Sequence, residues 1–162
     1  DIMYYNNNIP YMNCSGYGMD FTQEAFDKAL ELIREAVQDE RNDELKYEYL
    51  ISVAPTQDER SIITSIRDDE RNHRRLFKDI YRFYTGREIS SRDVENYAPP
   101  SSFIDGVNKA IMGELNAMEK YRLIREGLPS RLNRDTVFMI LTDEIKHAIK
   151  YNYILNKYSL KS

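Results

Sequence analysis

The sequence predicts an all-α protein, a four-helix bundle in which two antiparallel helical hairpins are joined by a long crossover. Four long stretches place apolar residues three and four positions apart, which is the spacing of one helix face. The five prolines all fall outside these stretches. A set of polar residues also recurs at a fixed spacing of 74, which indicates two similar halves. At 162 residues and 19.2 kDa, the chain is expected to form one domain.

The first hairpin is predicted from Phe21 to Gly86. Its first helix starts at Phe21 and stops near Val53, because Pro55 disfavours helical geometry at the residue before it. Its second helix starts at Thr56 or Gln57. Gly86 ends that helix, since glycine readily adopts the left-handed geometry of a helix C-terminus.

The second hairpin follows a connection, residues 85–102, that has no helical period and contains Thr-Gly, Ser-Ser and Pro-Pro pairs. A segment of this length can run the full height of a bundle and join two hairpins. The third helix is predicted over residues 102–126 and the fourth over residues 133–158. The Gly-Leu-Pro-Ser turn at 127–130 separates them.

The bundle therefore takes up residues 20–158. Residues 1–19 are rich in Tyr and Asn and have no period, so they are expected to form an extended arm that makes packing or oligomer contacts. Residues 159–162 are expected to be a C-terminal tail.

The composition excludes several partners. A net charge of −4 and a pI of about 5.3 argue against binding to nucleic acid or to an anionic membrane. No apolar run approaches the ~20 residues of a membrane span, and the N-terminal residues do not resemble a signal peptide. A single cysteine, Cys14, rules out an intramolecular disulfide and a rubredoxin-type iron centre. We therefore expect a cytoplasmic protein.

The most informative motif is Asp-Glu-x-x-His, which occurs at 69–73 and 143–147 and uses both histidines of the chain. In each case a glutamate lies 30 residues before the motif glutamate, and a tyrosine lies seven residues after that upstream glutamate. Five residues thus recur at a displacement of 74. Glu40, Tyr47, Asp69, Glu70 and His73 are matched by Glu114, Tyr121, Asp143, Glu144 and His147.

This spacing predicts that six side chains converge. Residues three apart share one helix face, so the Glu and His of each motif point the same way. In each hairpin the upstream glutamate and the motif lie about fifteen residues from the turn, a depth of ~22 Å. A pseudo-two-fold axis between the hairpins would bring both sets together at mid-bundle. One Glu from each of two helices and Glu-x-x-His from the other two is the ligand pattern of di-iron and di-manganese bundles.

The predicted cofactor is a pair of metal ions. Four carboxylates balance two divalent cations, and mixed imidazole and carboxylate ligation suits iron first, then manganese or a mixed pair. Asp69 is expected to hold His147, and Asp143 to hold His73, in a crossed arrangement that fixes the second ring nitrogen. Tyr47 is expected to hydrogen-bond a ligand carboxylate, as is its counterpart in the second hairpin. Without metal, some of the crowded carboxylates should have a raised pKa.

A single Glu-x-x-His on a helix is more often a solvated pair. Here the charges fall on apolar stripes, where an unpaired carboxylate costs several kcal/mol. The other carboxylates of the first helix, Asp43, Glu44 and Glu48, are expected to face solvent. Glu44 is close enough in phase to Glu40 to line an entry path.

With Glu-x6-Tyr and Asp-Glu-x-x-His present twice, residues 20–158 resemble the ferritin-like superfamily, in particular rubrerythrin and bacterioferritin. The resemblance implies that Glu70 and Glu144 bridge two irons. It also implies terminal ligands, which are Glu40 and His73 for one iron and Glu114 and His147 for the other. The chain departs from rubrerythrin because it lacks a rubredoxin domain and has Ala117 where rubrerythrins carry an extra glutamate.

The resemblance further implies a di-iron oxidoreductase of oxidative-stress defence that reacts with hydrogen peroxide or O2 at these six catalytic residues. A peroxidase would need an external, rubredoxin-like electron donor, whereas a ferroxidase would not. A homodimer is the expected assembly. Two other interpretations stay open: a bundle in which the metals are only structural, and an iron buffer.

Overall fold

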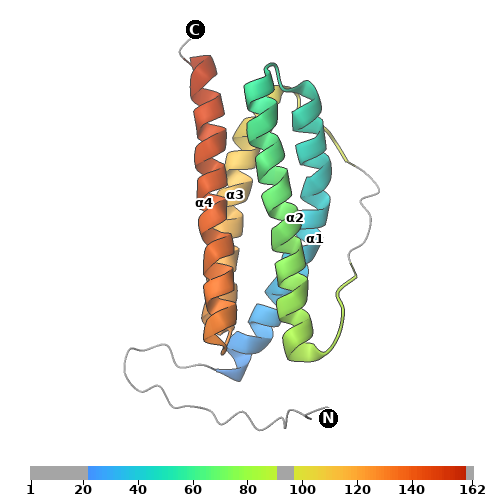
Figure 1. Cartoon of the computed structure of the whole chain (residues 1–162), viewed down its shortest axis with the longest axis vertical. Helices are drawn as coiled ribbons and strands as arrows, with labels where there is room; N and C mark the ends of the chain where they lie inside the picture. Colours follow the sequence, from blue (N-terminus) through green and yellow to red (C-terminus); the bar gives the residue numbers. More distant parts are fainter. Residues whose placement is uncertain (1–21, 91–96, 160–162) are drawn as a thin grey trace.

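The computed structural model describes residues 22–90 and 97–159, and it confirms the four-helix bundle (Figure 1). Within these ranges there is no strand. The helices are α1 (Gln23–Val53), α2 (Gln57–Thr85), α3 (Phe103–Gly127) and α4 (Arg131–Ser159). The pairs α1·α2, α3·α4, α1·α3 and α2·α4 are in contact, and the diagonal pairs are not. Two antiparallel hairpins therefore pack side by side around one central axis.

The helix ends follow the local sequence. Thr56 caps α2 by accepting a hydrogen bond from the backbone N–H of Glu59, whose side chain accepts one from Thr56 in return. Gly86 ends α2 with φ of 67°. The predicted start of the fourth helix was two residues late, because Ser130 directly after the proline caps it and α4 begins at Arg131.

The two hairpin turns are built alike. Arg60 donates a hydrogen bond to the carbonyl of Ala54 at 2.9 Å, and Arg134 donates one to the carbonyl of Leu128, also at 2.9 Å. Each of these residues lies 74 positions from its counterpart. The repeat that was read from the polar motifs thus extends to the chain reversals.

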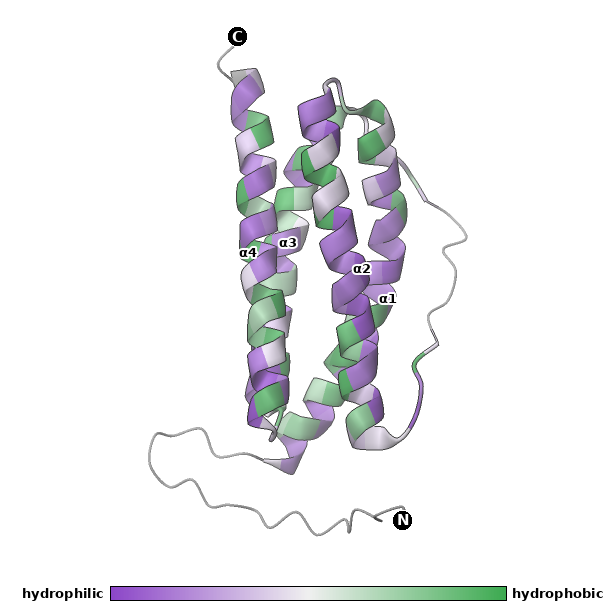
Figure 2. Cartoon of the chain, viewed as in Figure 1, coloured by the Kyte–Doolittle hydropathy of each residue, from purple (hydrophilic) through white to green (hydrophobic). Residues whose placement is uncertain are grey.

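Two apolar clusters fill the interior. One includes Ile33, Phe77 and Ile140, and the other includes Leu50 and Ile63. The buried charged residues of the motifs lie along the helices between these clusters, where the ribbon of α2 is mostly hydrophilic (Figure 2). The clusters shield this polar layer from bulk water along the bundle axis.

The predicted N-terminal arm lies outside the described residues, as does the predicted tail except for Ser159, the last residue of α4. No described helix combines the length and apolar character that crossing a membrane requires.

Candidate metal centre

The structure brings all six predicted side chains together in the middle of the bundle. Each is at most 7% exposed. They form two overlapping groups whose candidate ligand atoms lie within 4.8 Å of one another. The first ligand group is Glu40, Glu70, His73 and Glu144. The second ligand group is Glu70, Glu114, Glu144 and His147. Glu70 and Glu144 belong to both groups, as expected of bridging residues.

The polar atoms of this cluster are not satisfied by the protein alone. Oε1 of Glu70, Oε1 of Glu144 and Nδ1 of His147 are buried and make no hydrogen bond to the part of the chain that the structure describes. Nδ1 of His147 nevertheless lies 2.9 Å from Oε1 of Glu70, and Nδ1 of His73 lies 3.1 Å from Oε1 of Glu144. Buried polar atoms normally have partners, so this set fits a cation that the nitrogen and oxygen atoms share. These residues could hold a metal ion.

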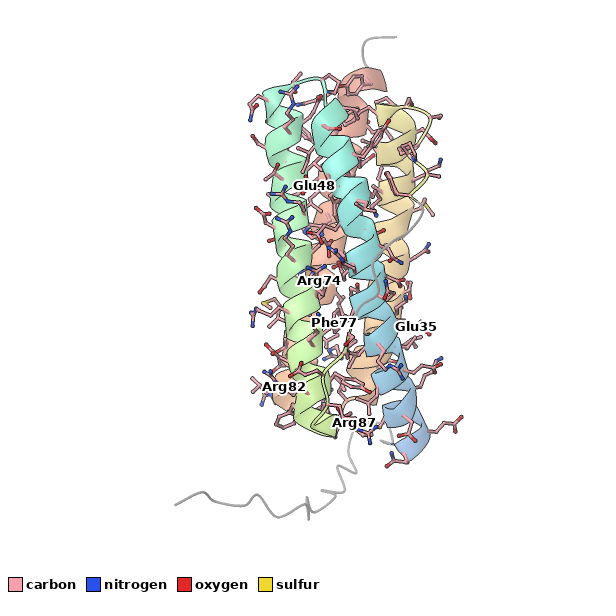
Figure 3. The ribbon with its side chains drawn as sticks, turned by 90° about the vertical axis from the view of Figure 1, so that its right-hand side faces the viewer. Glu35, Glu48, Arg74, Phe77, Arg82 and Arg87 are labelled. Atoms are coloured by element: carbon pink, nitrogen blue, oxygen red, sulfur yellow. The ribbon has the colours of Figure 1, made fainter. Side chains whose placement is uncertain are left out.

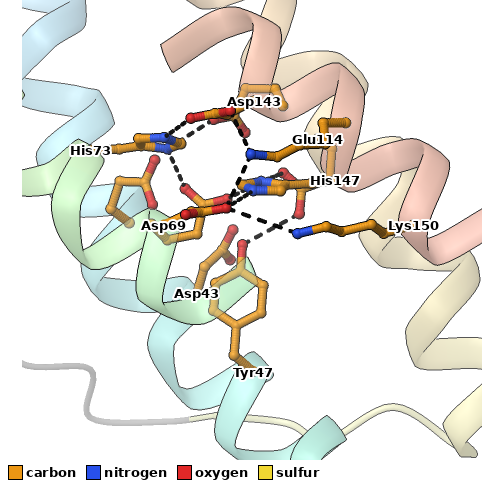
Figure 4. Close-up of polar contacts among 12 residues, drawn as sticks. Asp43, Tyr47, Asp69, His73, Glu114, Asp143, His147 and Lys150 are labelled. Carbon is orange, nitrogen blue, oxygen red and sulfur yellow. Dashed lines mark hydrogen bonds and ion pairs between the residues drawn. The ribbon is translucent and has the colours of Figure 1, made fainter. Parts of the chain in front are cut away.

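The outer nitrogens of the two imidazoles are held in the predicted crossed arrangement (Figure 4). Nε2 of His73 lies 3.2 Å from Oδ2 of Asp143, and Nε2 of His147 lies 3.0 Å from Oδ2 of Asp69. Each aspartate sits on the helix across from its histidine. These hydrogen bonds orient both rings so that Nδ1 faces the carboxylates.

The two tyrosines also bind across the hairpins. The hydroxyl of Tyr121 donates to Oε1 of Glu40 at 2.6 Å, and the hydroxyl of Tyr47 donates to Oε1 of Glu114 at 3.4 Å. Both bonds join α1 to α3. The predicted hydrogen bonds from the tyrosines to carboxylates of the cluster are confirmed, and each tyrosine binds the glutamate of the other hairpin.

Burial and neighbouring groups shift the pKa values of the cluster carboxylates in two directions. Burial, reinforced by the nearby charge of Glu70, raises the pKa of Glu40 and of Glu144 well above the ordinary value. Burial acts in the same direction on Glu70, but its close contacts with His147 and His73 outweigh it, and the pKa of Glu70 is lowered. Burial lowers the pKa of His147, yet its contacts with Glu114 and Glu70 raise it to about 10. Without metal, the cluster therefore centres on an ionised Glu70.

A cavity of about 200 Å³ leads from the surface between α1 and α3 to the glutamates of the cluster. Asp39 and Asp43 of α1 line it, opposite the small residues Gly113 and Ala117 of α3. The predicted role of Glu44 as an entry residue is wrong. Its side chain is turned toward α2, where Arg71 lies 2.8 Å and Arg74 lies 3.1 Å away, and Asp43 takes the place facing α3.

Two lysines at the cavity were not singled out from the sequence. Nζ of Lys46 lies 2.8 Å from Asp43, and Nζ of Lys120 lies 2.5 Å from Asp39. The 74-residue spacing could have identified them, since they are counterparts in the repeat. Lys146 lies 2.6 Å from Asp143 and 3.3 Å from Asp69. The repeat could not have identified it, because the residue 74 positions earlier is Asn72.

The fold and the cluster define an all-α four-helix bundle with a buried carboxylate and histidine site that could hold metal. No protein-family model matches the chain. Over 109 residues it is 28% identical to the uncharacterized protein YhjR of Bacillus subtilis (strain 168), covering 67% of this chain and 74% of that protein. It also resembles the crystal structure of a conserved hypothetical protein, rv2844, from Mycobacterium tuberculosis. That likeness has a TM-score of 0.69 and 18% identity, spans 83% of this chain and 99% of the other, and concerns the fold alone.

The aspartate behind each histidine should tune the metal affinity. We expect Asp69→Asn to weaken metal binding ~10–100-fold, because the amide supports His147 less well than the carboxylate does. A competition titration against a coloured chelator measures the affinity. Asp68→Asn, an exposed neighbour on the same helix, is the matched control. Equal affinities for the two variants would contradict a role of Asp69 in orienting His147.

Proposed function

We propose that this protein is a rubrerythrin-like di-iron oxidoreductase of the ferritin-like superfamily that reacts with hydrogen peroxide or O2. The observation that carries the proposal is that Glu70 and Glu144 are shared by both ligand groups. Carboxylates in that position bridge two metal ions ~3.5–4 Å apart. Each ligand group adds one glutamate and one histidine of its own, so two bound metals would have equivalent donor sets.

The donor chemistry supports iron, and manganese is the second choice. The cluster offers four carboxylates and two imidazoles, and the described residues around it contribute no thiolate. Two ferrous ions, when bound, supply the two electrons that convert hydrogen peroxide and two protons into two waters. The chain has to bind and orient the metals, admit the oxidant and keep bulk water out.

The surrounding residues suit these tasks. The cavity between α1 and α3 has room for a small oxidant beside Glu40 and Glu114, since one water molecule takes up about 30 Å³ of liquid. The hydroxyls of Tyr47 and Tyr121 hold the two terminal glutamates in place. The apolar clusters above and below the layer limit access from other directions.

Oxidation of ferrous iron is the second candidate, and the cavity mouth favours it. Asp39 and Asp43 place two carboxylates where a cation would enter. Each is paired with a lysine, Asp39 with Lys120 of α3 and Asp43 with Lys46, so an entering cation would have to displace the lysines. In this version iron is the substrate that passes through the site. In the peroxidase version iron stays bound and an external, rubredoxin-like donor reduces it. We also propose that the protein is cytoplasmic.

Rapid mixing separates the candidates. The anaerobic, ferrous-loaded protein is mixed with hydrogen peroxide and, separately, with O2, and the near-ultraviolet absorbance of the ferric product is followed. We expect a fast response in the wild type and none in E70Q/E144Q. A faster response to peroxide, with steady turnover once a reducing partner is added, supports the peroxidase. A faster response to O2 supports the ferroxidase. Two bound metals that respond to neither oxidant would contradict the catalytic proposal and favour a structural or buffering role.

A further inference from the structure

The outer face of the α3–α4 hairpin carries an unusual number of apolar side chains. Six large ones are between 36% and 64% exposed. We call them the α3–α4 face: Met112, Leu115, Phe138, Ile145, Ile149 and Tyr153. Figure 2 shows hydrophobic residues along the length of α4. The α4 members and Thr142 follow one another at three- and four-residue steps, which is the spacing of a seam that packs against another helix.

The repeat supplies an internal comparison for this face. Each of its six residues has a counterpart 74 positions earlier, on the outside of the α1–α2 hairpin. The counterparts are Gln38, Arg41, Thr64, Arg71, Arg75 and Asp79. All six are polar or charged. The same surface of the same supersecondary unit is therefore apolar in one hairpin and hydrophilic in the other.

The groove between the helices shows the same contrast. Between α1 and α2, Glu44 lies 2.7 Å from Arg41 and 2.8 Å from Arg71, and Glu48 lies 2.9 Å from Arg67. Figure 3 shows Glu48 and Arg74 among the charged side chains there. The residues at the corresponding places of the second hairpin are Leu115, Met118, Arg122, Leu141, Ile145 and Ala148. Five of these six are apolar, and Leu141 and Ala148 among them are buried. Apolar packing in the second hairpin therefore takes the place of the ion-pair network of the first.

Two cations lie against the ends of the apolar row on α4: the Arg125 guanidinium is 5.6 Å from the centre of the Phe138 ring, and Nζ of Lys157 is 4.9 Å from the centre of the Tyr153 ring. Lys146 and Lys150 flank the apolar row of α4, but both are turned toward α2. Nζ of Lys146 lies 3.3 Å from Asp69, and Nζ of Lys150 donates to the hydroxyl of Ser65 at 2.9 Å. The middle of the face, around Ile145 and Ile149, can therefore meet its own copy without burying like charges against each other.

We propose that the α3–α4 face binds a second copy of this chain in a two-fold symmetric dimer. The six residues expose roughly 600 Å² together, if a fully exposed large side chain has about 200 Å². A standard interface of about 800 Å² per partner is about 60% apolar, which is about 500 Å². In a two-fold contact the row on α4 meets its own copy, and an uncharged row such as Phe138, Ile145 and Ile149 is complementary to itself. This proposal is independent of the chemistry at the metal centre.

Light scattering coupled to size-exclusion chromatography tests the dimer. The wild-type chain of 19.2 kDa is expected to elute with twice that mass, about 38 kDa, at micromolar concentration. I145R/I149R introduces the arginines found at Arg71 and Arg75, and it should elute as a monomer with an unchanged far-ultraviolet circular dichroism spectrum. M112Q/L115R makes the corresponding change on α3 and should do the same, so the result does not depend on the folding of one variant.

The matched control is R75A/D79A, which alters the equivalent surface of α2 and should leave the dimer intact. A wild-type monomer throughout the micromolar range would overturn the proposal. So would a folded I145R/I149R variant that stays dimeric, because the contact would then lie elsewhere. A wild-type monomer that co-sediments with phosphatidylglycerol vesicles would assign the face to a lipid surface instead and would equally overturn the dimer.

Discussion

We expect the wild type to bind two metal ions and the variant E70Q/E144Q to retain neither. Both ligand groups contain both residues, so the double substitution removes two donors from each metal and two of the four negative charges. An amide oxygen is a weaker ligand than a carboxylate and cannot bridge two cations as effectively. Metal analysis after anaerobic loading with ferrous iron and desalting gives the count per chain.

Two further variants serve as controls for this metal count. E24Q/E119Q removes two exposed glutamates and should still bind two ions, so the net change in charge is controlled. Glu40→Gln touches only the first ligand group and should leave one ion bound. Retention of two ions by E70Q/E144Q would show that the metals do not depend on shared carboxylates.

Single substitutions of the two shared glutamates are expected to change the stability of the metal-free protein in opposite directions. Glu70→Gln should destabilise it by about 3 kcal/mol, because the ionised Glu70 is the partner of both imidazoles and its loss leaves the charge of His147 buried without it. Glu144→Gln should be neutral or stabilising. Its carboxyl is buried beside Glu70 and Glu114, so its ionisation is unfavourable in the fold.

The pH dependence distinguishes the two variants. The pKa of Glu144 is raised by folding, so this group contributes stability at acidic pH that is lost as the pH rises through its folded value. The gain from Glu144→Gln relative to the wild type should therefore increase between about pH 5 and pH 8. Urea unfolding of both variants in the presence of a chelator measures these differences. Equal losses of stability in both variants at both pH values would contradict the division of the cluster into an ionised Glu70 and a protonated Glu144.

The sequence was sufficient to predict the fold and the meeting of the six polar residues. The reason is physical, because a helix rises by a constant amount per residue. Glu40 and Glu70 are equally far from the turn between their helices, so they lie at the same depth in the bundle. The same holds for Glu114 and Glu144 around the second turn. The repeat makes the bonds of Asp69 and Asp143 equivalent, and the predicted crossing of these bonds between α2 and α4 is what the structure shows.

Other features depend on how the helices are arranged around the axis, which spacing along one helix does not define. Asp43 and Glu44 are neighbours in the sequence, yet about 100° of rotation separates them, so one faces α3 and the other faces α2. The apolar character of Ile145 and Ile149 could be read from the sequence as core packing. Only the structure shows that these side chains lie on the outside.

The most direct test of the dimetal centre is a crystal structure of the protein loaded anaerobically with ferrous iron, with anomalous scattering data collected on both sides of the iron absorption edge. We expect two anomalous peaks, ~3.5–4 Å apart and both between Glu70 and Glu144. One peak should lie next to His73 and the other next to His147. A single peak, or peaks outside this layer, would contradict this expectation.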